Sequence, residues 1–231
     1  SLQHLSWLLG TRAAVKHSLI FSLTASSGVR DIPEFLGSVL VDEVQAGYCD
    51  SNIKTAEPKV DWMRKFMKEN PQQLEWYVNK CIESQHFFRA TIDSLVKRLN
   101  QTRGAHILQR MSGCEWDDET GEIRGYIQYG YDGEDFIALD LQTLTWIASK
   151  PEAFITKLRW DADQAELDDY KYYYVHLYPD WLKKYVQYAN SSLQRTGTIT
   201  QPEIHTVLYS ICFFTFIYLF LLFVRMVCVR A

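Results

Sequence analysis

The pattern that most constrains the fold of this chain occurs twice. Short segments of alternating apolar and polar residues come first, then a proline, then a long helical stretch; Pro58 precedes the first stretch and Pro151 the second. Alternation is typical of strands, and apolar residues spaced by three and four are typical of helices. Strands followed by a helix, twice in one chain, predict an α+β fold.

In the first half we expect strands at residues 17–25, 34–41 and 43–50. A helix should cover residues 61–99, with an interruption at Asn70 and Pro71. Its apolar residues form one stripe, which predicts that this helix packs on a sheet. The stripe consists of Phe88, Ile92, Leu95 and Leu99.

In the second half we expect strands at residues 106–114, 122–131, 135–140 and 144–148, with turns at Gly121 and at Asp132-Gly133. A second helix should run from residue 151 towards residue 193. Pro179 lies inside it and should kink or break it, because proline lacks a backbone donor and clashes with the preceding turn.

Several segments resemble a known family in the same order. Residues 99–116 read LNQTRGAHILQRMSGCEW, residues 129–140 read YGYDGEDFIALD, and residues 180–196 read DWLKKYVQYANSSLQRT. They are similar to the antigen-binding platform of MHC class I heavy chains, and the residues look most like those of ray-finned fish chains. The resemblance covers residues 17–196. It implies an alpha-1 half at 16–104 and an alpha-2 half at 105–196, which share one eight-stranded antiparallel sheet topped by two long helices.

The resemblance also implies where a ligand would bind. Tyr173 and Tyr185 match tyrosines that hold the amino terminus of a peptide antigen. Phe21 and Glu75 match two further tyrosine positions but lack the phenol hydroxyl. An ammonium group has three donors to satisfy, so this end differs chemically from the family pattern, although the Glu75 carboxylate could pair with the ammonium.

The other end should hold a peptide carboxylate. Arg98, Thr156, Arg159 and Trp160 match the family positions for that role. Two guanidinium groups and an indole donor suit a carboxylate. The alternative for the arginines is an exposed helix face, and the alternative for Trp160 and the tyrosines is packing.

Gln109, Asp132, Gly133 and Asp135 match residues that face the light chain, beta-2-microglobulin. The alternatives are turn chemistry for Asp132 and Gly133, and an exposed strand face for Gln109. His17 and Asp42 match a buried structural ion pair of the family.

The cysteines depart from the family. Cys114 matches the cysteine in the sheet floor, but its partner position on the second helix is Tyr178, so that bridge cannot form. Cys81 on the first helix is not an obvious substitute partner for Cys114, and we predict no disulfide, with Cys114 unpaired. Loss of such a bridge typically costs about 2–5 kcal/mol, which predicts a loosely held second helix.

The ends of the chain predict a route to the cell surface. Residues 1–15 resemble the end of a signal peptide, with an ordinary terminus as the alternative. Residues 197–206 form a linker where the family continues into an immunoglobulin-like domain. Residues 207–224 carry no charge and would span about 27 Å as a helix, which is enough to cross a membrane. Residues 225–231 would then form a cytoplasmic tail. The alternative is that residues 207–224 form a buried core helix. Asn100 and Asn190 are glycosylation acceptors, and they fit a plasma-membrane protein made through the endoplasmic reticulum.

Composition and motifs exclude other functions. The net charge of −4 gives no support for nucleic-acid binding. No catalytic signature, metal-ligand spacing or cofactor motif is present in the sequence. Our first hypothesis is display of a short peptide to a T-cell receptor or a natural-killer-type receptor. The alternative is a divergent chain that presents no peptide and acts as a receptor ligand or assembly partner.

Overall fold

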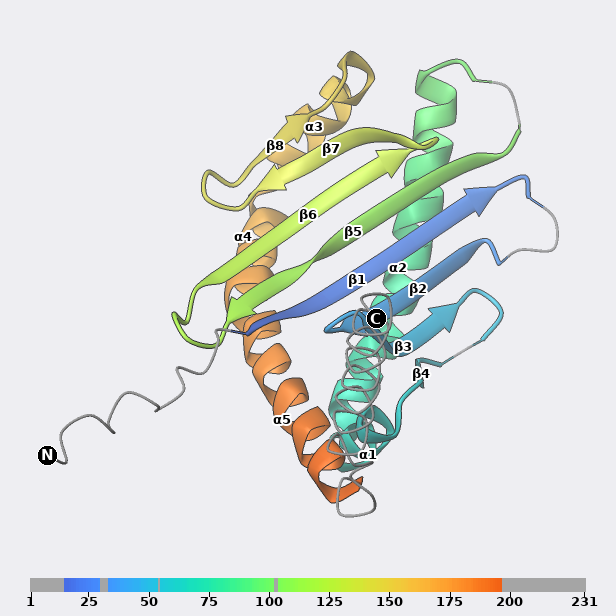
Figure 1. Ribbon diagram of the computed structural model, residues 1–231. Coiled ribbons are helices and arrows are strands. Elements are labelled where there is room, and N and C mark those ends of the chain that lie inside the picture. Colours follow the sequence, from blue (N-terminus) through green and yellow to red (C-terminus); the bar gives the residue numbers. More distant parts are fainter. Residues whose placement is uncertain (1–14, 30–32, 54, 102–103, 197–231) are drawn as a thin grey trace, which may run out of the picture. The chain divides into compact units, whose positions relative to one another are not determined.

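The computed structural model describes residues 15–29, 33–53, 55–101 and 104–196. These residues form an eight-stranded antiparallel sheet with the strand order β4-β3-β2-β1-β5-β6-β7-β8 (Figure 1). This confirms the α+β class and the eight-stranded platform. The strands are β1 Lys16–Ser27, β2 Phe35–Val41, β3 Val44–Asp50, β4 Glu57–Pro58, β5 His106–Asp117, β6 Ile123–Tyr131, β7 Glu134–Asp140 and β8 Thr145–Ala148.

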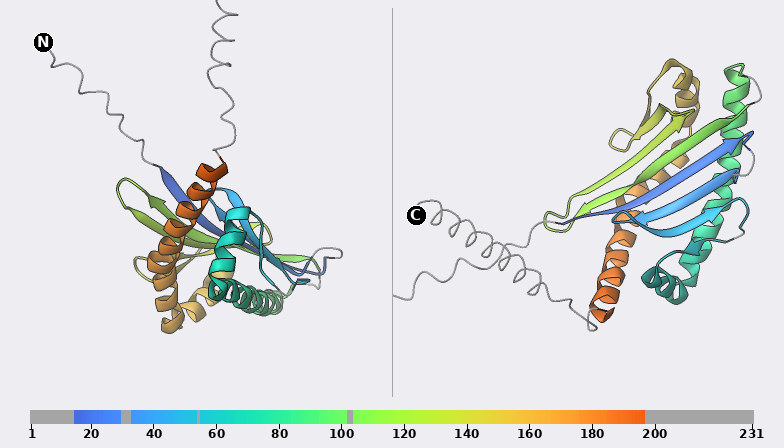
Figure 2. Two further views of the ribbon diagram at one scale, coloured as in Figure 1. Left: turned by 90° about the horizontal axis from the view of Figure 1, so that it is seen from below. Right: turned by 45° about the vertical axis from the view of Figure 1, so that its right-hand side comes forward.

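Two helical arms lie on the same face of the sheet, and within the described residues no helix lies on the other face (Figure 2). The helical residues up to Ala189 belong to the same compact unit as the sheet. The first arm consists of α1 Asp61–Glu69 and α2 Pro71–Arg98. The second arm consists of η1 Pro151–Ala153, α3 Phe154–Asp161, α4 Gln164–Tyr172, the π-helical turn η2 Tyr173–Leu177 and α5 Tyr178–Thr196.

Pro71 interrupts the first arm as predicted, whereas Pro179 affects the second arm in another way. Pro71 begins α2 directly after the break at Asn70. In the second arm the chain does not break at Pro179. The preceding turn widens instead, so that the backbone N–H of Tyr178 bonds to the carbonyl of Tyr173, five residues back. A π-helical turn of this kind offers a different bonding pattern just before a residue that has no N–H to donate.

A further break in the second arm was not predicted. Helix α3 ends at Asp161, and α4 begins after Asp163, whose side chain accepts a hydrogen bond from the backbone N–H of Glu166 at 3.2 Å. This is an ordinary N-cap, in which an aspartate oxygen satisfies an otherwise free helix donor.

The two halves repeat one hairpin device. His17 at the start of β1 lies 2.7 Å from the carboxylate of Asp42, and His106 at the start of β5 lies 2.9 Å from that of Asp132. Both aspartates have positive φ, 47° and 52°, in the turn that follows the next strand along the chain. The predicted His17–Asp42 pair is therefore present, although Asp42 is partly exposed.

Aromatic packing takes the place of the missing bridge to the second arm. Tyr178 is buried, and its ring lies 4.7 Å from that of Phe21 on β1 and 4.9 Å from that of Tyr174. Cys114 is buried on the floor with a free thiol, as predicted. Buried aromatic pairs stabilise packing beyond their area alone, so these contacts oppose the loosening that we expected from the lost bridge.

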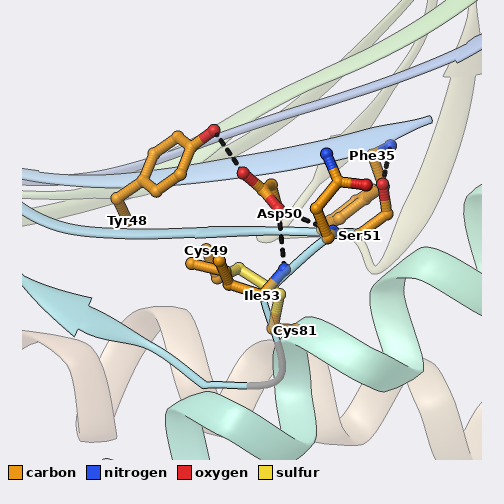
Figure 3. Close-up of a disulfide and its surroundings, with 8 residues drawn as sticks. Phe35, Tyr48, Cys49, Asp50, Ser51, Ile53 and Cys81 are labelled. Atoms are coloured by element: carbon orange, nitrogen blue, oxygen red, sulfur yellow. Dashed lines mark hydrogen bonds between the residues drawn. A yellow bond between two sulfur atoms is a disulfide. The ribbon is translucent and has the colours of Figure 1, made fainter. Parts of the chain in front are cut away.

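The structure corrects our prediction that the chain has no disulfide. Cys49 on β3 and Cys81 on α2 are bonded, with their Cα atoms 6.6 Å apart (Figure 3). Cys81 lies on the face of α2 that overlies β3, a proximity that depends on the helix phase and is invisible in the sequence spacing. The bridge therefore ties the first arm to the sheet, whereas the family bridge ties the second.

The predictions for the two ends of the chain fall mostly outside the described residues. This applies to residues 1–14 of the proposed signal segment, the linker 197–206, the apolar segment 207–224 and the tail 225–231. Within the described part of the chain, no helix combines the length and apolar character needed to cross a membrane.

The Cys49–Cys81 bridge should dominate the redox dependence of stability. We expect the double variant Cys49→Ser/Cys81→Ser to lose about 2–5 kcal/mol of unfolding free energy in urea, because the bridge restrains the unfolded chain. Cys114→Ser is the matched control, and it should keep the wild-type response to reductant. Peptide mapping should find Cys49 linked to Cys81, and a Cys114-containing disulfide in the native protein would contradict this assignment.

Candidate functional site

A cavity of about 330 Å³ lies between the helical arms above β1–β3 and β5. Its walls are mainly aromatic and aliphatic, and α2 contributes more of the lining than any other element. The Cys49–Cys81 bridge is part of its lining. The aromatic members of the lining are Phe21, Tyr48, Trp76, Tyr77, Phe87, Tyr170, Tyr173, Tyr174 and Tyr178.

One end of the space between the arms is closed by side chains that form hydrogen bonds and ring contacts with one another. The hydroxyl oxygens of Tyr77 and Tyr185 lie 3.0 Å apart, and the amide of Gln73 donates to the Tyr185 hydroxyl. Trp76 packs edge-on against Trp181 of the opposite arm, with ring centroids 4.7 Å apart. Tyr185 is 0% exposed. A ligand ammonium can reach its hydroxyl only if this cluster opens.

The residues predicted for the amino-terminal end are only partly brought together. Phe21 and Tyr173 line the cavity, whereas Tyr185 lies sealed behind the aromatic cluster. Glu75 is exposed and is not part of the lining, so its predicted place in the groove is corrected. The physical reason is helix phase: Tyr77, two residues later, faces the groove instead.

Tyr77 is the functional candidate that our sequence analysis missed. A signal was available, because Tyr77, Lys80, Ser84 and Phe87 recur at helical spacing and all line the cavity. A helical projection of α2 would have grouped them on one face.

The opposite end brings together all four residues predicted there. A smaller cavity of about 190 Å³ is lined by Arg98, Thr156, Arg159 and Trp160. Arg98 Nη2 donates to the Thr156 hydroxyl at 2.7 Å and to the Glu152 carbonyl at 3.3 Å. Burial and the charge of Arg159 lower the pKa of Arg98.

This arginine end has no acidic partner. Within the described ranges, no carboxylate lies within 4.0 Å of Arg98 or Arg159. The aromatic ring of Phe87 lines both cavities and lies 5.8 Å from Trp160 of the other arm. A ligand anion at this end would therefore meet two guanidinium groups without acidic partners and the rings of Phe87 and Trp160.

The remaining predicted residues lie away from the groove. Gln109 is exposed, and it alternates along β5 with residues that face the arms. Asp132 holds the start of β5, where its carboxylate also accepts the backbone N–H of Ile107 at 2.9 Å. Gly133 has a φ of 84°, and Asp135 is exposed. The turn chemistry that we considered for Asp132 and Gly133 is therefore present.

Both glycosylation candidates are exposed. Asn100 follows the end of α2 with a φ of 50°, and Asn190 lies on α5. Thr102, which completes the first acceptor sequence, falls outside the described residues.

The buried tyrosines should make the protein sensitive to alkali. Burial raises the pKa of Tyr77, Tyr174, Tyr178 and Tyr185 in the folded chain. The unfolded chain releases these protons near pH 10 while the folded chain keeps them, so stability should fall as the pH rises above about 10.

We expect unfolding and tyrosinate absorbance to change together in an alkaline titration. Tyr185→Phe should make the loss of stability with pH shallower. Tyr172→Phe is the matched control, because Tyr172 is exposed, and it should leave the slope unchanged. Tyrosinate absorbance that develops fully in the folded protein would contradict the burial of these hydroxyls.

Comparison with known proteins agrees with this architecture. Residues 15–193 match the family described as Class I Histocompatibility antigen, domains alpha 1 and 2. The chain is 35% identical over 181 residues to Major histocompatibility complex class I-related protein 1 of Rattus norvegicus, a match that covers 78% of this chain and 52% of that protein. It is 32% identical over 203 residues to the H-2 class I histocompatibility antigen, K-D alpha chain, of Mus musculus, covering 84% and 52%.

The chain is also 32% identical over 201 residues to the Class I histocompatibility antigen, F10 alpha chain, of Gallus gallus. This match covers 87% of this chain and 56% of that protein. The chain thus spans about half the length of the curated relatives it matches. Because the family match extends over both halves of the sheet and both helical arms, the chain belongs to the MHC class I family.

Proposed function

We propose that this chain is a class I-like display platform that holds a compact ligand at its arginine end and in its apolar cavity, without gripping a free amino terminus. Binding is noncatalytic, and the ligand is presented between the arms to a T-cell receptor or a natural-killer-type receptor. The observation that carries the proposal is the contrast between the two ends of the groove.

At one end the polar groups are already paired. Tyr185 is fully buried, and its hydroxyl contacts Tyr77 and Gln73. A ligand that displaces these contacts must replace them before it gains any free energy. At the other end Arg98 and Arg159 have no acidic partner among the described residues, so a ligand carboxylate adds charge-assisted hydrogen bonds without breaking an ion pair.

The cavity volume supports a compact ligand. A volume of about 330 Å³ falls at the small end of the range typical of small-molecule sites, about 300–1,000 Å³. Peptide display clamped at both ends, our first hypothesis from sequence, requires the aromatic cluster of Trp76, Tyr77, Trp181 and Tyr185 to open. Display of a short carboxylate-anchored peptide or of a small acid requires no such change.

The proposal includes a light chain on the open face of the sheet. Ile107, Gln109 and Met111 are exposed on β5, and two of them are apolar. An exposed apolar strand face of this kind is typical of a surface that a partner covers. We assign it to beta-2-microglobulin, with Asp132, Gly133 and Asp135 at its edge. We further propose that residues 207–224 anchor the chain in the plasma membrane with the platform outside the cell.

A specific observation also favours the second hypothesis, a platform that presents nothing. In the aromatic cluster, Trp76 packs edge-on against Trp181, and the hydroxyls of Tyr77 and Tyr185 pair with each other. Such a groove could serve as a rigid support for receptor contacts through the helix tops.

Ligand elution separates these functions. The full chain is expressed with beta-2-microglobulin, purified from cell surfaces and acid-eluted for mass spectrometry. We expect short acidic ligands, and we expect the double variant Arg98→Gln/Arg159→Gln to yield several-fold less of them. Arg124→Gln is the matched control, because Arg124 pairs with Glu122 at 3.2 Å and lines neither cavity. An empty groove on a folded surface chain would support the non-presenting platform.

Glycan mapping tests the proposed route through the endoplasmic reticulum. We expect Asn100→Gln to remove one glycan, because Asn100 is exposed in a turn at the end of a helix. Asn190 lies within a helix, so we expect its occupancy to be lower. Enzymatic deglycosylation that leaves the mobility of the wild-type chain unchanged would argue against passage through the secretory pathway.

A further inference from the structure

A disulfide forms part of the wall of the main cavity. Cys49 on β3 and Cys81 on α2 both line the cavity of about 330 Å³. Cys49 is 9% exposed, and Cys81 is more exposed than that. Gly37 lines the cavity as well, and a Cβ there would lie 3.2 Å from the Cys49 sulfur. Because glycine carries no side chain, the cavity stays open beside the bridge, and a ligand in it can contact the disulfide.

The bridge lies in the part of α2 that forms the cavity wall. Every α2 residue in the lining lies between Leu74 and Phe87. The buried residues of α2 all come later in the helix, at Phe88, Ile92 and Leu95. The part of α2 that faces the cavity thus has no fully buried side chain, and the disulfide is its covalent tie to the sheet.

The strand side of the bridge is held in place by hydrogen bonds. Asp50 follows Cys49 in the chain. Its carboxylate accepts the backbone N–H of Ile53 at 3.0 Å and the hydroxyl of Tyr48 at 2.9 Å (Figure 3). Cys49 should therefore keep its place on β3 if the bond opens, whereas Cys81 can move with the helix.

The charges near the bridge do not oppose the approach of a thiolate, the species that attacks disulfides. Lys80, the residue before Cys81, lines the cavity and lies 2.6 Å from the carboxylate of Glu83. Glu57 is the other lining carboxylate from the first half of the chain, and it pairs with Lys59 at 2.7 Å. Each of these two negative charges therefore has a positive partner.

We propose that the Cys49–Cys81 disulfide is a thiol-exchange site, at which a compact thiol with an apolar body is captured covalently in the main cavity. The ligand loses its proton to water, and its thiolate attacks the sulfur of Cys81. The bond between Cys81 and Cys49 breaks as the bond between the ligand and Cys81 forms, and the Cys49 thiolate takes up a proton from water. One disulfide replaces another, so the step consumes no oxidant or reductant.

The reverse reaction defines the ligand class. The released Cys49 thiol stays beside the new disulfide and can attack it, which reforms the bridge and expels the ligand. A captured thiol therefore persists only if burial of its body in the cavity stabilises the adduct. The aromatic lining favours an apolar body over a polar one. The inference rests on the proposed display function in that it names a further ligand class, apolar thiols, for the same cavity.

The test compares two primary alkyl thiols that differ in their bodies. The purified full chain in detergent is incubated with 2-phenylethanethiol or with 2-mercaptoethanol, quenched in acid to stop exchange, and weighed by mass spectrometry. We expect about tenfold more adduct from the phenyl thiol at equal concentration, because its ring is buried. The adduct should carry the whole mass of the thiol, since exchange removes no hydrogen.

Unfolding the chain in urea, in the same detergent, should abolish this preference. A preference that persists in urea would come from the detergent or from the thiols themselves and would overturn the proposal. Equal yields from the folded chain, or reduction of the bridge without an adduct, would overturn it as well.

Peptide mapping at low pH then locates the adduct. We expect the probe on Cys81 and a free thiol at Cys49. Cys114→Ser is the matched control and should keep the yield, because Cys114 is buried and takes no part in the exchange. Excess 2-phenylethanol, which has the same body but no sulfur, should compete for the cavity and lower the yield. A probe on Cys114, or a yield that phenylethanol leaves unchanged, would refute the assignment.

Ligand elution from cells decides the proposed function separately. Thiol capture by a chain that releases no ligand in acid or in reductant would uphold the exchange site and refute display. Acidic ligands eluted from a chain that captures no thiol would uphold display and refute the exchange site.

Discussion

The antiparallel ladder between β1 and β5 is the constraint on which the rest of the structure depends. The strands pair along their whole length, from Lys16 opposite Asp117 to Ser27 opposite His106, and so join the two halves into one sheet. A close approach at Gly113 makes the ladder possible, because a Cβ there would lie 2.0 Å from the Leu19 carbonyl oxygen. Alternation along β5 then sends Arg110 towards the arms and Gln109 to the open face.

The β1–β5 ladder fixes the sheet, but the helical arms are attached to the sheet by side chains. The two arms are attached by different kinds of contact. A covalent bond between Cys49 and Cys81 joins the first arm to β3. The second arm is held by rings, with Tyr178 over Phe21 and Trp181 against Trp76. A disulfide mainly restrains the unfolded chain, whereas ring packing stabilises only the folded one. The second arm is therefore the one whose position a ligand or a partner can shift without breaking a covalent bond.

Features that depend on local sequence were predictable, and features that depend on how distant elements meet were not. The strand segments, the break at Pro71 and the grouping of Arg98, Thr156, Arg159 and Trp160 around one cavity followed from alternation, proline chemistry and family motifs. The rotation of α2 about its axis decides that Cys81 meets Cys49 and that Tyr77, not Glu75, faces the groove. A rotation of one residue changes the face by about 100°, and segment boundaries do not fix it. Nor does the sequence reveal that Arg110 has no acidic partner among the described residues, because that requires knowing every group around it.

The two ends of the groove differ in how many of their polar and charged groups already have partners in the protein. At the tyrosine end, hydroxyl and amide groups already pair, so an entering ligand exchanges one set of hydrogen bonds for another. Arg110 lines the larger cavity, and Arg98 and Arg159 line the smaller one; in the described ranges no carboxylate lies within 4.0 Å of these guanidinium groups. An anion at Arg98 and Arg159 would add charge-assisted hydrogen bonds without breaking an ion pair. The proposed selectivity for acids therefore rests on these guanidinium groups, and the shape of the cavity walls would select among acids.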